Sequence, residues 1–467
     1  MFKSRRGFNP YYGKRRQSVS PLWIALSIPA LLLLLELLTR ILVGVLGQGN
    51  EFALYQGEPA NFSAYRLRFL NEAEQTYDGL PNRGSLEAQQ HLAMGYKLAG
   101  NQESSYWYIN DQGFRDLEPV PLAKPKDEVR IFLLGGSTAF GQWNSGNEAT
   151  IASKLQARLN ERIAQQKNSP EKYQPDVLSF YKPERDRAKK LERKIRGKRY
   201  RVINAAVPGY ASGNELAQLA LEILPYKPDV IVVLNGYSDL MLSSTQEATE
   251  IPHLESFLNN APRHFAAYLT QPVKEWFQNT YIVKATQHWM VKPEPTVAQQ
   301  SLVVTEDDIA LSEQLPSSAE ELELRLSRYR QNHLQMLRLS VGGGASLVLA
   351  LQPEITTLES TESEAEQQVL KALGDKYIQQ VQNDYPQFAQ INQQLGQSFP
   401  KNVKAVNFYD ALPKLLAESQ ANSDSEATFA DAIHLSEKGN QVLATQLYYT
   451  ITSLKSIQII PKNSELR

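Results

Sequence analysis

The stretch Ile131-Phe132-Leu133-Leu134-Gly135-Gly136-Ser137-Thr138 contains a strand pattern followed at once by a turn. Four consecutive large apolar residues predict a strand covered on both faces, as in a parallel sheet. Gly135 and Gly136 end this strand, and Ser137 follows at its carboxyl end, where open α/β sheets bind their ligands. The stretch therefore predicts a parallel sheet with a hydroxyl group at its functional edge.

Further strands and helices are expected to alternate along the chain. Strands are expected at residues 129–134, 201–207, 230–234, 346–351 and 403–408, where β-branched residues gather. Helices are expected at 148–165, 214–224, 319–340, 365–382 and 437–451. This alternation predicts an open three-layer α/β/α sandwich with right-handed crossovers.

The composition is that of a globular protein. Of 467 residues, 42% are apolar, which excludes wholesale disorder and collagen-like structure. The chain has no Cys, so disulfides, thiolate metal sites and thiol nucleophiles are excluded. Residues 182–201 contain eleven Lys and Arg against three acidic residues, yet the net charge of the chain is −1. No binding of nucleic acid is expected from this charge balance.

Residues 22–46 are almost entirely apolar and predict a transmembrane helix. Glu36 and Arg40 interrupt the run, and their i, i+4 spacing predicts an ion pair on one helix face. Residues 1–20 carry six Lys and Arg and no acidic residue, which predicts a cytoplasmic tail. The rest of the chain is then extracytoplasmic or periplasmic, on a single-pass anchor in the cell (inner) membrane. A cleaved signal peptide is the alternative, although no clear cleavage site follows the run.

The chain is accordingly divided into a basic tail, an anchor, a covering segment, a large domain and a short C-terminal tail. The predicted bounds are 1–20, 21–47, 48–125, 126–455 and 456–467, with insertions in the large domain at about 166–200 and 241–318.

Ser137 allows several interpretations. A phosphate-binding loop requires a Lys that is absent here, and the glycine spacing does not fit a dinucleotide-binding loop. The nucleophile elbow of α/β-hydrolases requires Gly where this chain has Ala139. A serine nucleophile on a different α/β scaffold remains possible, and so does a tight turn with a capping serine.

Asp431 and His434 form a second candidate pair just before the last predicted helix. Of the six histidines, only His434 has a carboxylate three residues before it in such a loop. This spacing lets Asp431 reach Nδ1 of the imidazole and leaves Nε2 free to take a proton from a hydroxyl group. A surface pair is the simpler alternative.

Two glycine-containing loops close the second and third predicted strands. They are Asn204-Ala205-Ala206-Val207-Pro208-Gly209-Tyr210 and Asn235-Gly236-Tyr237-Ser238-Asp239. A Gly at a strand's carboxyl end can present its N–H to a developing oxyanion. Turn formation alone would explain both loops equally well.

Taken together, the order of these motifs resembles the SGNH (GDSL-like) hydrolase superfamily. The matching residues are Gly135-Gly136-Ser137, Gly209, Gly236-Tyr237-Ser238-Asp239 and Asp431 to His434. Upstream, Asn110-Asp111-Gln112-Gly113-Phe114-Arg115-Asp116 is similar to a lead-in motif of the family's membrane-anchored bacterial members. The resemblance covers about residues 105–450 without the two insertions, and it implies a parallel, flavodoxin-like sheet.

The resemblance also implies roles for individual residues. Ser137 would be the nucleophile, His434 the general base and Asp431 the group that orients it. The N–H groups of Ser137 and Gly209 would hold the oxyanion, with no metal or cofactor. The family has Asn where this chain has Ser238, so either Ser238 or Asn235 is expected to be the third donor.

Three functions remain open at this stage. The first is a membrane-anchored serine esterase that hydrolyses O-acyl esters of a lipid or glycan outside the cytoplasm. The second is an O-acyltransferase that modifies an envelope polysaccharide. The third is a non-catalytic scaffold on an SGNH fold. The sequence does not indicate an oligomeric state.

Overall fold

The structure is a computed structural model with two compact units. It describes residues 21–49, 52, 55, 57–71, 73–74, 76, 82, 84–246, 269–270, 272–273, 276–277, 279–291, 296–301, 310–358, 360–419 and 426–463. The first unit combines Met1–Gly57 with Val273–Pro293, and the second combines Glu58–Pro272 with Glu294–Arg467. The predicted basic tail at 1–20 lies outside the described residues, as do 247–268, 292–295 and 302–309 of the second predicted insertion.

The second unit is built on a five-stranded parallel sheet. Its strands are β6 (Glu128–Gly135), β8 (Arg199–Asn204), β9 (Val230–Asn235), β10 (Ser346–Leu351) and β11 (Val403–Asn407). They lie in the order β11-β10-β9-β6-β8, and every neighbouring pair is parallel. Counted along the chain this is the order 2-1-3-4-5, which is the flavodoxin-like arrangement. The predicted fold class is confirmed.

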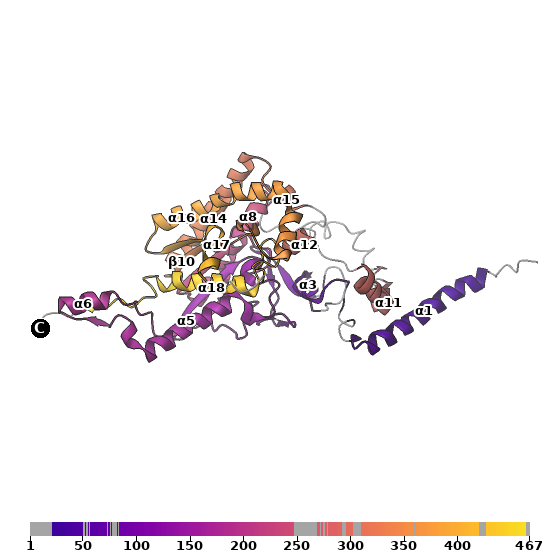
Figure 1. Cartoon of the computed structure of the whole chain (residues 1–467), viewed down its shortest axis with the longest axis horizontal. Coiled ribbons are helices and arrows are strands. Elements are labelled where there is room, and N and C mark those ends of the chain that lie inside the picture. The colour runs from indigo at the N-terminus through magenta and orange to yellow at the C-terminus, as the bar shows by residue number, and fades with distance from the viewer. Residues whose placement is uncertain are drawn as a thin grey trace, which may run out of the picture. The chain divides into compact units, whose positions relative to one another are not determined.

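Helices cover both faces of this sheet. They include α5 (Ile151–Asn168), α7 (Ser212–Gln218), α14 (Ala319–Gly342), α15 (Glu364–Asp384), α16 (Pro386–Ser398), α17 (Phe408–Glu418) and α18 (Glu437–Thr452). α5 packs against α18, whereas α7 and α16 pack against α14. Figure 1 shows α14 and α16 on one side of β10 and α5 with α18 on the other. The result is the three-layer arrangement that the alternation of elements predicts.

Sequence periodicity explains which face each element buries. Every residue of β6, β9 and β10 is buried, because these strands are covered from both sides. On α5 the residues Ile151, Leu155, Leu159 and Ile163 recur every four positions and are all buried. Thr150 caps the helix by accepting a hydrogen bond from the backbone N–H of Ser153 at 3.3 Å.

The structure corrects several predicted bounds. Strand β8 ends at Asn204, not at 207, and the following residues form a loop. Helix α5 begins at Ile151 because Asn147–Ala149 form a separate 3-10 turn before the Thr150 cap. Helices α16 and α17 were not predicted. The second contains Pro413 inside, which weakens a sequence-based helix signal, whereas the composition of the first does not explain why it was missed.

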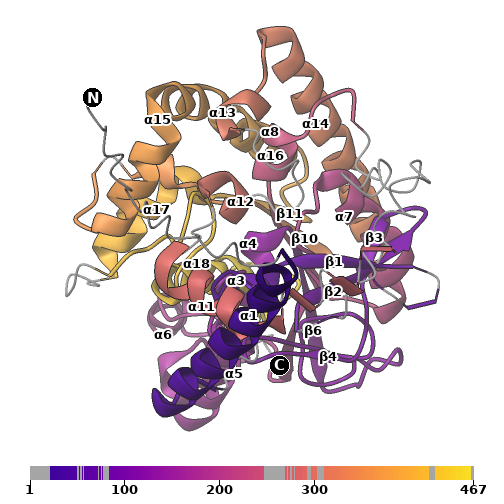
Figure 2. The same ribbon diagram turned by 90° about the vertical axis from the view of Figure 1, so that its right-hand side faces the viewer.

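Smaller elements surround the sandwich (Figure 2). Between residues 58 and 125 lie α3 (Ala60–Tyr65), β1 (Leu67–Leu70), β2 (Leu86–His91), β3 (Gly95–Leu98), β4 (Gln102–Glu103) and β5 (Tyr108–Ile109), of which β1, β2 and β3 form a sheet. The predicted insertion at 166–200 contains β7 (Val177–Leu178) and α6 (Lys182–Lys189). Strand β7 pairs with β12 (Lys462–Asn463) from the predicted C-terminal tail. The second predicted insertion contains α12 (Val297–Ser301) and α13 (Leu311–Gln314).

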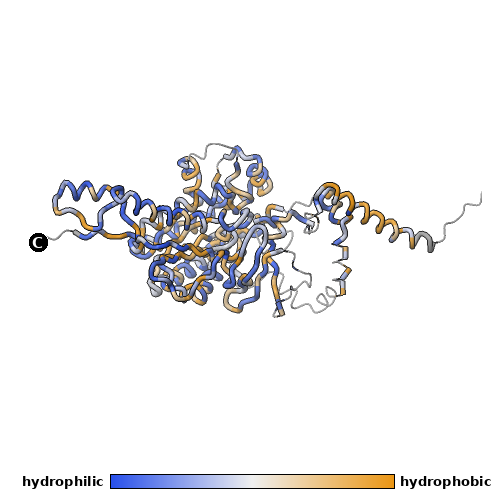
Figure 3. Tube along the Cα trace, turned by 90° about the horizontal axis from the view of Figure 1, so that it is seen from below, coloured by the Kyte–Doolittle hydropathy of each residue, from blue (hydrophilic) through white to orange (hydrophobic). Residues whose placement is uncertain are grey.

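The first unit contains the long apolar helix α1 (Pro21–Val45). Its window Leu26–Val45 has a mean hydropathy of 2.2 and is long enough to cross a membrane. Figure 3 shows this helix as a nearly continuous apolar rod. The predicted ion pair is confirmed, since Arg40 Nε lies 2.8 Å from Glu36 Oε1.

Candidate active site

The loop after β6 holds Ser137 at the first position of the short helix α4 (Ser137–Phe140). Gly135 has a φ of +150°, and a Cβ there would lie 2.2 Å from the carbonyl oxygen of Leu234 and 2.6 Å from Cβ of Ala139. Only Gly fits this turn without displacing β9. Because the first N–H groups of a helix have no partner within it, the Ser137 N–H is available to a ligand.

Asp431 and His434 form a buried pair, as their spacing predicted. Nδ1 of His434 lies 2.6 Å from Oδ2 of Asp431. The other carboxylate oxygen accepts the backbone N–H groups of Ile433 at 2.9 Å and His434 at 2.8 Å. Burial by itself raises the pKa of Asp431, but His434 and the two N–H groups outweigh it and hold this pKa below its ordinary value. A carboxylate is thus placed to fix the imidazole tautomer.

The far nitrogen of this imidazole is buried without a protein partner. Within the residues that the structure describes, Nε2 of His434 forms no hydrogen bond. A buried polar atom without a partner is uncommon in proteins and calls for an explanation. At this position Nε2 is free to exchange a proton with a neighbouring hydroxyl group or a substrate.

The serine loop and the histidine loop are joined by hydrogen bonds although 295 residues separate their bonded residues. The Thr138 hydroxyl donates to the carbonyl oxygen of Ile433 at 3.2 Å, and the side-chain amide of Gln352 donates to the same hydroxyl at 3.1 Å. Thr138, which follows Ser137, is therefore hydrogen-bonded to Ile433, which precedes His434. No hydrogen bond joins the Ser137 hydroxyl to His434 itself, and catalytic hydrogen bonds are often long before substrate binds.

The loops after β8 and β9 reach the same edge of the sheet. A Cβ on Gly136 would lie 3.2 Å from the carbonyl oxygen of Tyr210 and 3.5 Å from the Ser238 hydroxyl. Gly209, beside Tyr210, has a φ of +86° and is partly exposed. The segments that carry Ser137, Gly209 and Ser238, the last of which lies in the short helix α8 (Tyr237–Met241), thus meet around Gly136.

Asn235 occupies a different place from the one proposed for an oxyanion donor. Its amide nitrogen donates to the buried carboxyl of Glu215, and its amide oxygen accepts the hydroxyl of Tyr329 at 3.0 Å. Both ends of this amide are engaged within the protein core. Of the two predicted third donors, this arrangement favours Ser238.

Asp239, the last residue of the third motif, connects two of these loops. Its carboxylate accepts the backbone N–H of Ser212 at 3.0 Å and also the Ser212 hydroxyl. Burial raises the pKa of Asp239, and the hydrogen bonds from Ser212 oppose that rise. Asp239 therefore attaches the loop after β9 to the start of α7.

The assignment of the fold rests on the sheet order and on the places of the four motifs. The serine follows the first strand, the glycine loops follow the second and third strands, and the Asp–His pair precedes the last long helix. The first and third strands, β6 and β9, are neighbours at the point where the strand order reverses, which is where flavodoxin-like sheets bind ligands. The second unit has a flavodoxin-like α/β/α fold, and its motifs follow one another in the order that the resemblance to SGNH hydrolases implies.

Comparisons with known proteins give only distant likenesses. No family model and no curated protein matches the chain. Among solved structures, an acetyl xylan esterase is 11% identical over 69% of this chain and 100% of its own, with a TM-score of 0.34. A lipase/acylhydrolase from Enterococcus faecalis is 13% identical over 72% of this chain and 100% of its own, also with a TM-score of 0.34.

Trp143 is a site residue that the sequence did not indicate. Its indole N–H donates to Oδ2 of Asp431 at 2.7 Å and lies 3.1 Å from Nδ1 of His434. The indole ring stacks on Phe62 of α3 at 5.0 Å and meets the His434 ring edge-on at 5.9 Å. Trp143 has a φ of +67°, which is strained for a bulky residue and which the surrounding contacts must hold in place. The only sequence signal is a lone Trp in a polar loop shortly after Ser137.

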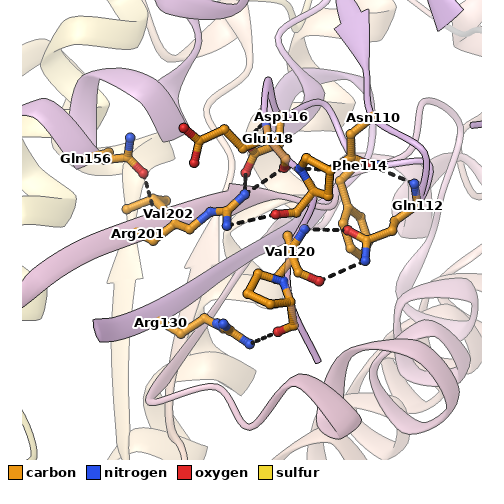
Figure 4. Close-up of polar contacts among 12 residues, drawn as sticks. Asn110, Gln112, Phe114, Asp116, Glu118, Val120, Arg130, Gln156, Arg201 and Val202 are labelled. Carbon is orange, nitrogen blue, oxygen red and sulfur yellow. Dashed lines mark hydrogen bonds and ion pairs between the residues drawn. The ribbon is translucent and has the colours of Figure 1, made fainter. Parts of the chain in front are cut away.

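The lead-in motif of the SGNH resemblance forms a loop bonded within itself and to β8 (Figure 4). The side-chain oxygen of Asn110 accepts the backbone N–H groups of Gln112 and Phe114, both at 3.0 Å. Arg201 of β8 donates to the carboxylate of Asp116 at 3.2 Å. These contacts fix the course of the backbone around Arg115.

Arg115 connects this motif to the helix that begins with Ser137. Its buried guanidinium donates to the carbonyl oxygens of Phe140 at 3.1 Å and Gly141 at 2.8 Å, at the C-terminal end of α4. It also donates to the Tyr65 hydroxyl at 3.0 Å. The guanidinium satisfies the free carbonyl groups at the end of the helix and holds α4 in position.

Glu354 is a buried carboxyl group close behind the histidine loop. Burial raises its pKa to about 7, although it accepts the backbone N–H of Thr356 at 2.8 Å and the Tyr377 hydroxyl at 3.2 Å. The next residue, Ile355, donates its N–H to the carbonyl oxygen of Ala432 at 2.8 Å. A group that titrates near neutral pH is therefore linked to the loop that carries His434.

Over the described ranges, no group of three or more His, Asp or Glu is placed to hold a metal ion.

Proposed function

We propose that the second unit is a serine esterase that hydrolyses O-acyl esters of a lipid or a glycan. The observation that carries this proposal is the buried Asp431–His434 pair, whose free Nε2 lies on a loop bonded to the residue after Ser137. A hydroxyl, an imidazole and a carboxylate in this order are the parts of a serine-hydrolase triad. Further support comes from the position of Ser137 after β6, at the edge where open α/β sheets bind their ligands.

The proposed reaction begins when Oγ of Ser137 attacks the acyl carbonyl carbon. Nε2 of His434 takes the hydroxyl proton as the Oγ–C bond forms, and Asp431 stabilises the imidazolium through Nδ1. The tetrahedral intermediate collapses by breaking the bond to the alcohol, which leaves with the proton from Nε2. Water then attacks the acyl carbon while Nε2 takes its proton. The Oγ–C bond breaks, the carboxylic acid leaves, and Nε2 returns the proton to Ser137 Oγ.

The negative charge on the intermediate needs donors at the carbonyl oxygen. The N–H groups of Ser137 and Gly209 and the hydroxyl of Ser238 are the proposed donors, supported by the meeting of their loops around Gly136. Losing one such donor in other enzymes costs about 10²–10³ in rate. Because a serine hydroxyl is shorter than the Asn side chain of the family, we expect a modest turnover number.

Helix α1 is proposed to hold the enzyme at the cell membrane as a single-pass anchor. Its length and hydropathy support a crossing. The six positive charges of residues 1–20 support a cytoplasmic N-terminus, and the SGNH-like unit then lies on the extracytoplasmic side.

The test of the proposed activity is labelling of the purified full chain with a fluorophosphonate, which reacts with activated serines. Ser137→Ala is expected to abolish labelling, and the matched control Ser453→Ala, at an exposed serine on the same unit, is expected to retain it. Absence of labelling in the folded wild-type protein would refute the enzyme proposal and favour a scaffold.

Product analysis then separates hydrolysis from transfer. Unlabelled wild-type protein is supplied with an O-acetylated glycan, with and without an unmodified acceptor glycan. Free carboxylic acid in both arms supports an esterase. Acylated acceptor in place of free acid would instead identify an acyltransferase that uses the same residues.

A further inference from the structure

The first compact unit is formed by two segments that are far apart in sequence. Residues Val273–Pro293, which lie within the insertion after β9, belong to the same unit as α1. Within this unit, α11 (Tyr281–Ala285) and the helical turns Thr286–Val291 follow one another, and α11 packs against α1. The insertion therefore returns to the proposed membrane anchor.

The contact between the two segments lies at the middle of the apolar helix. Glu36 accepts the backbone N–H groups of Tyr281 and Ile282, each at 3.0 Å, and Arg40 lies 4.6 Å from the centre of the Tyr281 ring. Glu36 is ten residues from the start of the apolar window Leu26–Val45 and nine from its end. At 1.5 Å per residue this places it about 15 Å from one end and about 14 Å from the other.

A carboxylate at that depth of a bilayer is costly unless it is paired and hydrogen-bonded. Arg40 and the two N–H groups supply those partners. A backbone that donates to the middle of a membrane-spanning helix must itself lie within the membrane. The hydrogen bonds of Glu36 thus place the start of α11 well below the bilayer surface.

The segment then runs along α1 toward the helix's C-terminal end. Ala285 joins a buried cluster with Val43 and Phe52, and Nζ of Lys284 donates to the carbonyl oxygen of Phe52 at 2.6 Å. The ring of Trp289 lies 5.3 Å from that of Phe52. Trp and Lys side chains at this level are typical of a membrane–water interface.

Most of the outward-facing side chains described in this segment are large and apolar, although Asn279 and Thr286 are also exposed. Val273, Trp276, Phe277, Met290 and Val291 are between 52% and 80% exposed in the isolated chain. The Leu residues of α1 that would face lipid have similar exposure, for example Leu33 at 67%. The apolar surface of the segment therefore continues that of the proposed anchor.

We infer that the described residues of this segment, 273, 276–277 and 279–291, enter the lipid bilayer beside α1 as a second membrane-contacting element, with lipid acyl chains as the occupant of their apolar surface. The inference rests on the proposed anchoring by α1. The insertion that follows β9 then contains a membrane-bound segment. The chain of the SGNH-like unit is thereby connected to the membrane through this insertion as well as through α1.

The absence of Cys makes single-cysteine scanning a clean test. Full-length variants Met290→Cys and Phe277→Cys are reconstituted in lipid vesicles, with Leu33→Cys in α1 as the lipid-facing reference and Leu92→Cys, 97% exposed on the second unit, as the aqueous reference. Each cysteine is labelled with a fluorophore, and quenching is measured with lipids that carry a spin label on the acyl chain. A second sample is treated with a membrane-impermeant maleimide.

We expect Phe277→Cys to be quenched like Leu33→Cys and to react with the maleimide at least tenfold more slowly than Leu92→Cys. Met290→Cys lies nearer the interface, and we expect it to be quenched more than Leu92→Cys but less than Leu33→Cys. Quenching of Leu33→Cys alone would overturn the inference and leave the anchor intact. Protection from the maleimide without lipid quenching would also overturn it and would indicate a protein partner or a second copy. If Leu33→Cys itself is not quenched, the anchoring proposal fails.

Discussion

The hydrogen bond between Trp143 and Asp431 allows a sharp test of how the proposed triad is held. In Trp143→Phe the carboxylate loses the indole N–H at 2.7 Å, but an aromatic ring remains to stack on Phe62. Hydrogen bonds to charged groups contribute about 1.5–3 kcal/mol. Asp431 keeps His434 and two backbone N–H donors, so only part of this energy should be lost from the transition state.

We expect a loss of about 1.4 kcal/mol in transition-state stabilisation, which corresponds to about a tenfold decrease in kcat. KM should change little, because an indole that positions the carboxylate does not bind substrate. The assay is hydrolysis of p-nitrophenyl acetate, with kcat and KM measured separately and the unfolding temperature recorded for each variant.

The matched control is Trp107→Phe. Its buried indole N–H donates to the carbonyl oxygen of Ala64 at 3.0 Å and makes no contact with the Asp–His pair. This variant should lose stability without a specific loss of kcat. The reasoning is refuted if Trp143→Phe keeps the wild-type kcat, or if both variants lose kcat in proportion to their loss of stability.

Three further predictions follow from the same region. Gly135→Ala should destabilise the protein by several kcal/mol, because it combines a strained backbone with a clash against β9. The control Gly197→Ala has nothing within 4 Å of the new methyl group and should not destabilise the protein. Equal unfolding temperatures of the two variants would contradict this prediction. Burial raises the pKa of Glu354 from 4.5 to about 7 in the folded state. Between pH 4.5 and 7 the native state therefore holds a proton on Glu354 that the unfolded state has lost. The free energy of unfolding should fall by up to about 3 kcal/mol as the pH rises from about 4.5 through 7. Glu354→Gln should flatten that pH dependence in thermal unfolding, and an unchanged slope would assign it to other groups. Ser238→Asn, which restores the family's side chain, should raise kcat about tenfold and Ser238→Ala should lower it; no change in either variant would remove Ser238 from the oxyanion site.

Much of the architecture follows from local patterns. The apolar runs at β6, β9 and β10 mark strands buried on both faces, and all five predicted strands are present in the structure. Ser137 and the Asp431–His434 pair were recognisable because a glycine turn after a strand and a three-residue spacing are local features. The helices α16 and α17 were missed although their buried residues recur at helical spacing, and they pack on β10, β11 and α18.

The environment of the site could not be predicted in the same way. Trp143, Phe62 and Arg115 come from three separate loops or helices, and nothing in their neighbouring residues indicates contact with Asp431 or with α4. The sequence offered both Asn235 and Ser238 as candidates for the third oxyanion donor. Its bonds to Glu215 and Tyr329 become visible only once β9, α7 and α14 are packed together.

Periodicity and turn residues depend on interactions between near neighbours, and for that reason the sheet, its functional edge and the apolar α1 can be recognised in the linear chain. Other hydrogen bonds join partners that are about 245 to 295 positions apart. They link Thr138 to Ile433, Trp143 to Asp431, and Tyr281 and Ile282 to Glu36. Such contacts have no local energetic signature, because they arise only when the packing of whole helices and strands brings distant segments together.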